Sequence, residues 1–466
     1  MKDHSAAATE DKALKRSVGL TDLVMLGAGS AIGVSIFTVL GPAAKVAGSG
    51  LLIATVLAAV PMVIFGFVYA FMASALPKTG ASYEWQREFV HPFAGFVVVW
   101  LRIIGNVALM VLLARVLVAY LSMVWSGIPT VPVMLGLFTV VFGLNYFGAS
   151  IAARAQTVLM LLLLAVFALF VGFGAHEFSS AQLEPLFPGW SPILAAIPLL
   201  VSLFLGIESN TEIGGEVRNA ERNIPLGLVL ALGLTALVYL SISVVALGAV
   251  GPVKLADSSA PLLTAARHAL GTWATPLIVT AAFLSLLKSL NATLLVFTRF
   301  LFAMGQAGVL PSGMAKVHPR WKTPHVATTV VFLASVLGTA VSQDILPLLL
   351  AVNIPTMLKY FGTCLASLNV IRSRPDVYAR ARLQFSQTLI VIASVAGMIA
   401  AVVLIALGFE TDWRPYALLA VWTVAGVSYW LVRVHRQRPG RIESASASPV
   451  GHDASAEIDR RPETAP

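Results

Sequence analysis

Long apolar stretches alternate with short polar stretches along almost the whole chain. A helix that crosses the hydrocarbon core of a bilayer needs about 20 mostly apolar residues. Twelve stretches satisfy this pattern, near residues 20–46, 51–75, 93–125, 131–149, 155–175, 191–213, 224–250, 272–304, 325–342, 345–371, 387–408 and 414–433. The pattern predicts an all-α polytopic membrane protein with twelve transmembrane helices in one domain over residues 18–436.

The composition agrees with this class. Hydrophobic residues make up 58% of the 466 residues and charged residues only 11%, whereas about a quarter of a soluble domain is charged. The single cysteine, Cys364, excludes an internal disulfide framework. The net charge of +9 does not indicate a nucleic-acid partner, because most basic residues lie in alternate loops and in the two tails. This distribution instead predicts the lipid bilayer as partner.

The basic residues also predict the orientation. Loops that remain in the cytoplasm carry an excess of Lys and Arg. One set of alternate loops and both tails hold most of these residues, and the opposite loops contain only Lys45, Lys254, Arg267 and Arg414. We therefore predict an integral protein of the plasma (inner) membrane with both termini in the cytoplasm. The N-terminal tail covers residues 1–17, and residues 437–466 have the composition of a disordered tail.

The first apolar stretch contains the segment Gly27-Ala-Gly-Ser-Ala-Ile-Gly-Val-Ser-Ile-Phe37. Each glycine inside a helix costs roughly 1 kcal/mol relative to alanine, so this segment disfavours a continuous helix. Broken membrane helices place their half-helix ends near the bilayer midplane, where they bind substrates and ions. The alternative is that the small residues let neighbouring helices pack closely. The spacing alone leaves both interpretations open.

The sixth stretch, five after the first, is interrupted in the same way at Phe204-Leu-Gly206-Ile-Glu208. A broken first helix in each of two halves is typical of an inverted repeat. We predict a five-plus-five inverted repeat with broken helices 1 and 6, whose halves cover about residues 20–175 and 191–371. Two extra C-terminal helices, over about residues 387–433, lie outside the repeat.

These segments resemble the amino acid–polyamine–organocation (APC) superfamily of permeases, and the resemblance covers the first ten spans nearly continuously. Five motifs carry it: Gly27-Ala-Gly29 with Ile32-Gly33-Val-Ser35-Ile-Phe37; Leu76-Pro-Lys-Thr-Gly-Ala-Ser-Tyr83; Phe204-Leu-Gly206-Ile-Glu208; Gly215-Glu216-Val-Arg-Asn-Ala-Glu-Arg-Asn-Ile-Pro225; and Arg299 through Gly308-Val-Leu-Pro311, with His318-Pro319 and Thr323-Pro324. Five motifs in the right order on the right spans are more specific than any one glycine motif. On this resemblance, residues 18–436 form a transporter domain.

The resemblance implies an alternating-access transporter of amino acids or related small organic solutes, with the substrate held between broken helices 1 and 6. The positions that match the family's substrate site are Ile32, Gly33, Val34, Ser35, Ser202, Phe204 and Gly206. Free amides at a helix start carry a partial positive charge that suits a carboxylate. Phe204 is expected to cover the substrate as a gate, and its alternative role is ordinary helix packing. The sequence Gly33-Val34-Ser35 departs from the family's usual Gly-Ser/Thr-Gly, which bears on how a carboxylate would be held.

Charged side chains near the membrane centre cost at least ~2.5–3.5 kcal/mol each and indicate function by default. We assign coupling or gating roles to Glu208, Lys288, Arg102, Lys359 and Asn291. The resemblance implies a coupling or gating carboxylate at Glu208. Lys288 is expected to stand in for the sodium ion of sodium-coupled relatives, and its burial would favour proton exchange. The alternative is a structural Lys288–Glu208 pair.

The cations of the third, eighth and tenth spans outnumber the nearby acids Glu208 and Glu212, which favours a neutral or anionic substrate. Protons are the expected coupling partner, by symport or by exchange. Sodium coupling, an amine or carboxylate exchanger of the same fold, and a solute-sensing receptor remain alternatives. The sequence contains neither a membrane-embedded His/Asp/Glu cluster nor a phosphate-binding loop, so we expect no enzyme, cofactor or metal site. The oligomeric state stays open.

Overall fold

The protein is described by a computed structural model over residues 14–258, 260–340, 345–411 and 413–436. The predicted tails, residues 1–13 and 437–466, lie outside this range. The first part contains α2 (Leu20–Ala31), α3 (Ser35–Thr38), α4 (Leu40–Ala47), α5 (Leu51–Ala75), α6 (Ala81–Phe89), α7 (Pro92–Leu121), α8 (Thr130–Tyr146) and α9 (Ala149–Gly174).

The second part contains α10 (Trp190–Val201), the 3-10 turns η4 (Ser202–Phe204), η5 (Ile207–Thr211) and η6 (Gly214–Glu216), then α11 (Ala220–Ala256), α12 (Pro261–Leu270), α13 (Ala274–Gln306), α14 (His325–Gly338) and α15 (Ile345–Ser373). The short helix α16 (Pro375–Arg380) leads to α17 (Gln387–Thr411) and α18 (Arg414–Arg436). Across these ranges the chain is helical and forms no strand, which confirms the predicted class. Two isolated backbone bridges join Val18 to Val217 and Thr79 to Ile213.

Nine of the described helical segments are long and apolar enough to cross a bilayer, and α8 and α14 are shorter apolar helices. Large apolar side chains are exposed on their outer surfaces, for example Leu237 at 64% and Leu337 at 72%. Apolar surface on this scale marks an interaction site, and hydrocarbon tails are the partner that satisfies it. The polytopic membrane class is therefore supported, while the twelve-span count and the inverted repeat remain predictions.

Several predicted boundaries were displaced. Helix α9 begins at Ala149 rather than near residue 155, and α11 begins at Ala220 rather than near residue 224. Polar first turns explain both differences, since residues such as Arg154 and Glu221 continue a helix past the end of its apolar stretch. Helix α11 is kinked at Gly251, directly after the predicted end at residue 250, before it continues to Ala256. Helices α7 and α8 end at Leu121 and Tyr146, about four residues earlier than predicted.

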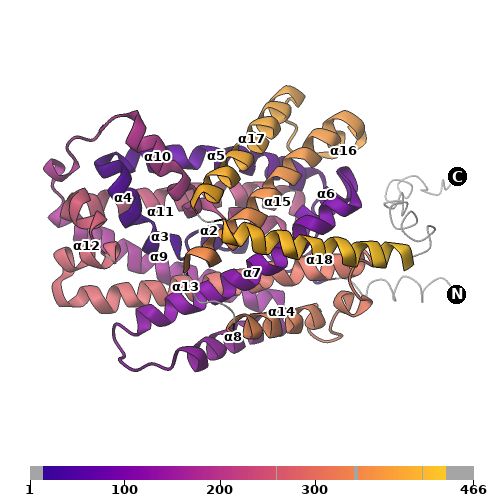
Figure 1. The fold of residues 1–466 in the computed structure, drawn as a ribbon, viewed down its shortest axis with the longest axis horizontal. Coiled ribbons are helices and arrows are strands. Elements are labelled where there is room, and N and C mark those ends of the chain that lie inside the picture. The colour runs from indigo at the N-terminus through magenta and orange to yellow at the C-terminus, as the bar shows by residue number, and fades with distance from the viewer. Residues whose placement is uncertain (1–13, 259, 341–344, 412, 437–466) are drawn as a thin grey trace, which may run out of the picture.

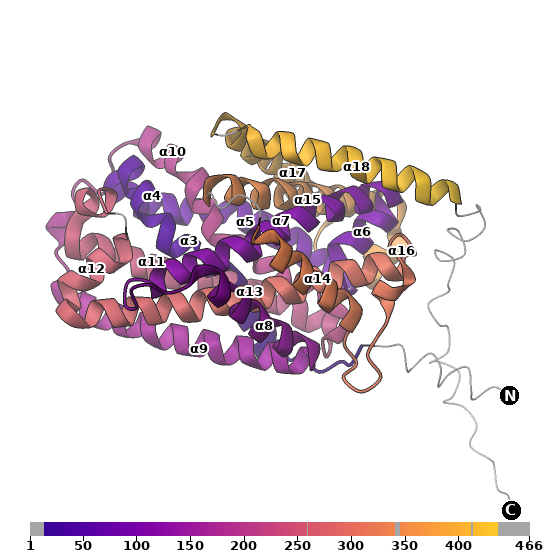
Figure 2. The ribbon, with the colours of Figure 1, turned by 60° about the horizontal axis from the view of Figure 1, so that its bottom comes forward.

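The helices form an elongated bundle in which α4 and α12 lie at one end and α6 and α16 at the other (Figures 1 and 2). Helix α2 lies inside the bundle and packs against α9, α11, α13 and η5. Helix α17 packs against α15 and α5, and α18 packs along α7 and α15 on the outer surface (Figure 2). This arrangement places the two interrupted segments, α2–α4 and α10–η6, among packed helices, where free backbone groups can find partners.

Candidate functional site

The first interrupted segment breaks between α2 and α3. Ile32 closes the helix with ψ at 71°, and regular helix resumes only at Ser35. A helix end leaves carbonyl groups without intrahelical partners, and these carbonyls carry the negative end of the helix dipole. The break therefore creates a buried group of oxygen acceptors inside the bundle.

Lys288 of α13 fills this group of acceptors. Its Nζ donates to the carbonyl oxygen of Gly29 at 2.6 Å and also to that of Ile32. The Oγ of Ser285, one turn earlier on α13, donates to Ile32 O at 2.8 Å. Lys288 is fully buried, and within the described chain it has no carboxylate partner. A buried ammonium thus lies at the carbonyl end of α2. Its predicted role as a substitute for a sodium ion stays a prediction.

Tyr239 of α11 supplies a further donor at the break. Its hydroxyl donates to Ala31 O at 2.8 Å, and its ring meets the Phe204 ring edge-on at 5.8 Å. Both side chains are fully buried. In this conformation Phe204 packs on Tyr239, so the observed contact is compatible with ordinary packing as well as with a gate. The sequence did not indicate Tyr239, because an uncharged tyrosine is not unusual in an apolar span, whereas a charged residue is.

The second break lies between η4 and η5. Leu205 is extended with ψ at 134°, and Gly206 has φ at 105°. A β-carbon on Gly206 would lie 3.1 Å from the Ser30 backbone of α2, so the two interrupted segments meet here without a side chain between them. Ser35 Oγ also donates to Ser202 O at 3.2 Å. The two predicted breaks are therefore in direct contact.

Gly27 illustrates the other interpretation of the glycine-rich segment. A β-carbon there would lie 2.9 Å from Ala231 Cβ and 3.0 Å from Ile207 O. Gly27 thus permits close packing of α2 against α11 and η5, while the chain breaks five residues later. The segment therefore combines a helix break with close packing, and the binding role of the break stays a prediction.

Glu208 lies two residues beyond Gly206 and bonds to two residues of α15. Its Oε1 accepts from Lys359 Nζ at 2.6 Å, and its Oε2 accepts from Tyr360 OH at 2.5 Å and from Gly206 N at 3.1 Å. The alternative Lys288–Glu208 pair is therefore wrong. Lys359 lies within ion-pair distance of Glu208, whereas Lys288 is held by the carbonyls of α2.

Two other predicted coupling residues lie away from the breaks. Asn291 bonds to Asn145 of α8 at 2.9 Å and to Gln156 of α9 at 3.2 Å. Arg102 of α7 donates to Thr356 Oγ1 and, at 3.1 Å, to Asn106 Oδ1. Neither side chain is hydrogen-bonded to a broken segment. Hydropathy identifies such residues as exceptional but does not give their partners.

A buried ion pair that sequence reasoning missed joins α13 to η6. Arg299 Nε and Nη2 donate to the two carboxylate oxygens of Glu216 at 2.7 and 3.0 Å. Both side chains are almost completely buried. Both residues lie in motifs that resemble the permease family. Because 83 positions separate them in the sequence, no local pattern predicts their contact.

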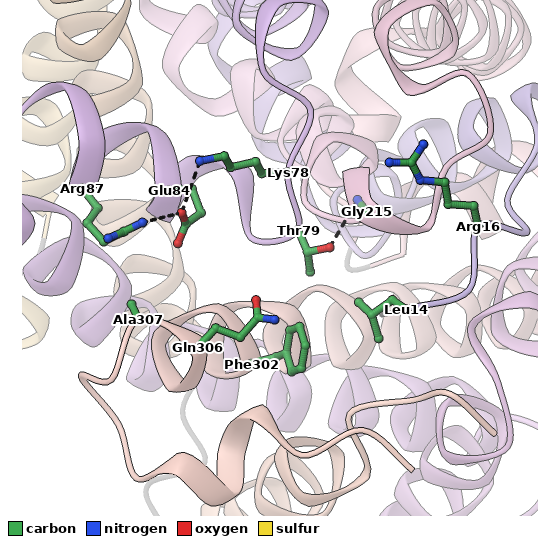
Figure 3. Close-up of a pocket in the computed structure, with 10 residues that line it drawn as sticks. All are labelled: Leu14, Arg16, Lys78, Thr79, Glu84, Arg87, Gly215, Phe302, Gln306 and Ala307. Carbon is green, nitrogen blue, oxygen red and sulfur yellow. Dashed lines mark hydrogen bonds and ion pairs between the residues drawn. The ribbon is translucent and has the colours of Figure 1, made fainter. Parts of the chain in front are cut away.

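A polar pocket opens at the α6 end of the bundle (Figure 3). It is lined by Leu14, Arg16, Lys78, Thr79, Glu84, Arg87, Gly215, Phe302, Gln306 and Ala307. Glu84 bonds to Arg87 at 2.9 Å and lies 3.7 Å from Lys78. Partial burial opposes the charge on Arg87, but the attraction of Glu84 outweighs it and raises the pKa of the guanidinium. Thr79 Oγ1 accepts from Gly215 N at 3.2 Å, and both residues line this pocket (Figure 3).

Comparisons with known proteins indicate a family of transporters. A family model described as amino acid permease matches residues 18–451. An uncharacterized transporter of Mycobacterium tuberculosis (strain ATCC 25618 / H37Rv) is 34% identical over 71% of this chain and 75% of its own. A branched-chain amino acid permease of Bacillus subtilis (strain 168) is 27% identical over 81% of this chain and 85% of its own. A methylthioribose transporter of the same Bacillus strain is 24% identical, over 82% and 86% of the two chains.

Proposed function

The chain belongs to the amino acid permease family, and on that premise we propose that it is a secondary active transporter that moves its solute by alternating access. Membership in this family makes the protein an integral membrane transporter rather than an enzyme. We propose the plasma membrane as its location, with both termini in the cytoplasm. The solute is an amino acid or a related small organic molecule.

The position of Lys288 is the observation that best supports the coupling mode. Broken helices of transporters coordinate sodium ions or protons with unwound backbone carbonyls. Here the carbonyls of Gly29 and Ile32 accept from the lysine ammonium instead. A covalently attached cation leaves no role for a sodium ion at these oxygens. We therefore favour proton coupling or exchange over sodium coupling.

The proposed substrate position lies where the two breaks meet. It comprises Ile32, Gly33, Val34, Ser35, Ser202, Phe204 and Gly206. The Ser35–Ser202 contact supports this choice, because it brings these backbone segments within hydrogen-bond distance. In this proposal the Phe204 ring leaves its contact with Tyr239 and moves over the bound substrate, which it then covers as a gate.

Charge supports a neutral or anionic substrate. The ionised side chain bonded to the first break is the Lys288 ammonium, and the Glu208 carboxylate beyond the second break is bonded to Lys359. No free carboxylate thus faces the breaks in the described chain to attract a cationic side chain. The two Bacillus relatives are named for different solutes, branched-chain amino acids and methylthioribose, so a ligand screen identifies the substrate.

Thermal unfolding of the purified protein with amino acids, amines and small carboxylates tests substrate and coupling together. A ligand that binds only the native state stabilises it by RT ln(1 + [L]/Kd), about 2.7 kcal/mol at 100 Kd. We expect a neutral or anionic ligand to raise the unfolding midpoint equally in sodium and choline buffers. Stabilisation that requires sodium would contradict the coupling proposal. If no amino acid, amine or carboxylate stabilises the protein, the proposed substrate class is refuted and the family assignment alone stands.

Lys288→Ala tests the role of the lysine directly. Removal of the ammonium leaves Gly29 O and Ile32 O without their donor, so we expect at least a tenfold loss of uptake in proteoliposomes. Because the vacated oxygens can accept a cation, the unfolding midpoint of this variant should become sodium-dependent. Lys254→Ala, at an exposed lysine, is the matched control and should behave as wild type. Unchanged uptake by Lys288→Ala would refute the proposed role.

A further inference from the structure

Two carboxylates share one cation at the second break. Glu208 and Glu212 lie four positions apart and are 6% and 0% exposed. The Nζ of Lys359 lies 2.6 Å from a Glu208 oxygen and 3.8 Å from a Glu212 oxygen. A buried carboxylate is stable only when it is paired and hydrogen-bonded. One ammonium cannot neutralise both groups.

The remaining groups that face this pair are neutral. Those that bond to the pair or to its direct partners are Tyr69 of α5, Ser82 and Gln86 of α6, and Tyr360 and Thr363 of α15. The other buried guanidinium groups nearby are engaged elsewhere. Arg299 is neutralised by Glu216. Arg102 bonds to the neutral Thr356, one turn before Tyr360 on α15, and to Asn106, and it bonds to neither glutamate. If both glutamates were ionised, Lys359 would be the one cation within ion-pair distance of them in the described chain, and the pair would carry one excess negative charge.

We propose that this cluster keeps one proton, that Glu212 holds it, and that this is the proton moved during transport. The proposal rests on the proton coupling proposed above and names the carboxyl that performs it. Glu208 has the stronger set of donors, since Lys359, Tyr360 and the Gly206 amide all bond to it. Glu208 therefore retains the negative charge, and Glu212 takes the proton.

A chain of hydroxyl groups can satisfy the hydrogen bonds of Glu212 in both its protonated and its ionised form. Its Oε1 contacts Ser82 Oγ, which lies 3.2 Å from Tyr69 OH. Tyr69 OH lies 3.1 Å from Thr363 Oγ1, which can donate to Lys359 O at 3.0 Å. When Glu212 is protonated, each group donates to the next and the chain ends on the carbonyl. When Glu212 is ionised, Thr363 donates to Tyr69, Tyr69 to Ser82, and Ser82 to the carboxylate.

The proton would leave through the pocket at the α6 end. Ser82 N donates to Glu212 Oε2 at 3.1 Å, and Gly80 N donates to Glu212 O at 2.8 Å. The next contact outward is Thr79 Oγ1 with Gly215 N, which borders the pocket in Figure 3. Separation of α6 from this loop would expose Glu212 to water. The proton would then pass from the carboxyl to water, leaving the carboxylate bonded to Ser82.

Glu212→Gln tests the proposal in proteoliposomes, with the ligand identified by the thermal screen as the transported solute. The glutamine amide can donate to Ser82 Oγ as the protonated acid does, so the fold and substrate exchange should be preserved. Accumulation driven by a pH gradient should fall at least tenfold, and solute-driven proton movement should disappear. Glu184→Gln, at an exposed position in another loop, is the matched control. Gradient-driven accumulation at the wild-type level in Glu212→Gln would overturn the proposal.

Infrared difference spectroscopy provides a readout that does not depend on transport. At neutral pH the wild type should show the C=O stretch of a buried protonated carboxyl, and Glu212→Gln should lack it. If Glu212→Gln does not fold, Ser82→Ala replaces it. This variant removes the hydroxyl partner and should shift the pH at which the C=O band disappears; an unshifted band would count against the proposal.

The two proposals fail in different ways. Wild-type protein that ignores a pH gradient would refute proton coupling itself and, with it, the role of Glu212. Wild-type coupling that persists in Glu212→Gln would leave proton coupling intact and refute only the assignment of the proton to Glu212.

Discussion

Arg299 and Glu216 form a complete bidentate ion pair inside the bundle, with N–O distances of 2.7 and 3.0 Å. Lys288 is buried to the same extent but bonds to backbone oxygens rather than to a carboxylate. The two arrangements respond differently to substitution. Loss of Arg299 leaves a charge without a partner, whereas loss of Lys288 leaves only neutral carbonyls.

Arg299→Met should therefore be strongly destabilising. Breaking a buried pair by removing one partner costs about 3–5 kcal/mol, while replacing both partners by apolar residues is often neutral. We expect a large fall in the thermal unfolding midpoint for Arg299→Met and a substantial recovery in Arg299→Met/Glu216→Met. Arg320→Met, at an exposed arginine, serves as control. Equal midpoints for the single variant and the wild type would refute this prediction.

At the residue scale, the sequence identified unusual side chains better than it identified their partners. Lys288 and Glu208 stood out because charges are rare in apolar spans. Lys288 meets Gly29 across 259 positions, and Glu208 meets Lys359 across 151, and no local pattern encodes such separations. Helix packing determines these contacts, so they became visible only in the structure.

At the scale of elements, the two interruptions differ in form. The first consists of the non-helical residues between α2 and α3, after which α-helix resumes. The second is followed by the 3-10 turns η5 and η6 rather than by another α-helix. Gly206 connects the two segments, because its positive φ and its contact with Ser30 both exclude a side chain.

Gly206→Ala tests this junction. A non-glycine residue in a sparsely populated backbone region costs of order 1–3 kcal/mol, and the added methyl group would also press on the Ser30 backbone. We expect a lower unfolding midpoint and a loss of uptake. Gly136→Ala on α8 is the control, because a β-carbon there meets no atom within 4 Å. Wild-type uptake by Gly206→Ala would show that this contact does not matter.

The parts of the fold that depend on the length of apolar runs could be predicted from the sequence. Apolar runs located the helices, and clustered glycines located both interruptions. Hydropathy did not reveal that α9 continues through Arg154, because a polar turn forms helix as readily as an apolar one. It also did not distinguish 3-10 turns from α-helix after Gly206, a difference that depends on local packing.

On the scale of the whole molecule, the two ends of the bundle differ in charge. The α6 end includes Arg16, Lys78 and Arg87 around its pocket, and basic residues mark cytoplasmic loops. The α4 and α12 end includes fewer, such as Lys45 and Arg267. The predicted orientation therefore places the pocket in the cytoplasm.

Cysteine labelling can test this orientation with little preparation. The single native cysteine, Cys364, is fully buried and should not react with a membrane-impermeant maleimide. Ala181→Cys lies in η3 (Ser180–Leu183) and Lys316→Cys follows the α13 end, and both positions are exposed. In intact cells we expect labelling of Ala181→Cys alone, with Lys316→Cys labelled only after permeabilisation. The reverse result would invert the proposed topology.

The bridge between Val18 and Val217 has an evolutionary consequence. It is built from main-chain groups: Ser17 N and Val18 N donate to Glu216 O, and Arg218 N donates to Val18 O. Every residue except proline carries an amide that can form these bonds. Mutations can therefore accumulate at the less buried positions 17 and 218 while the geometry persists, whereas the side chain of Val18 is held by the core. Among homologues, its signature would be an avoidance of proline at the donor positions rather than the preservation of any one side chain.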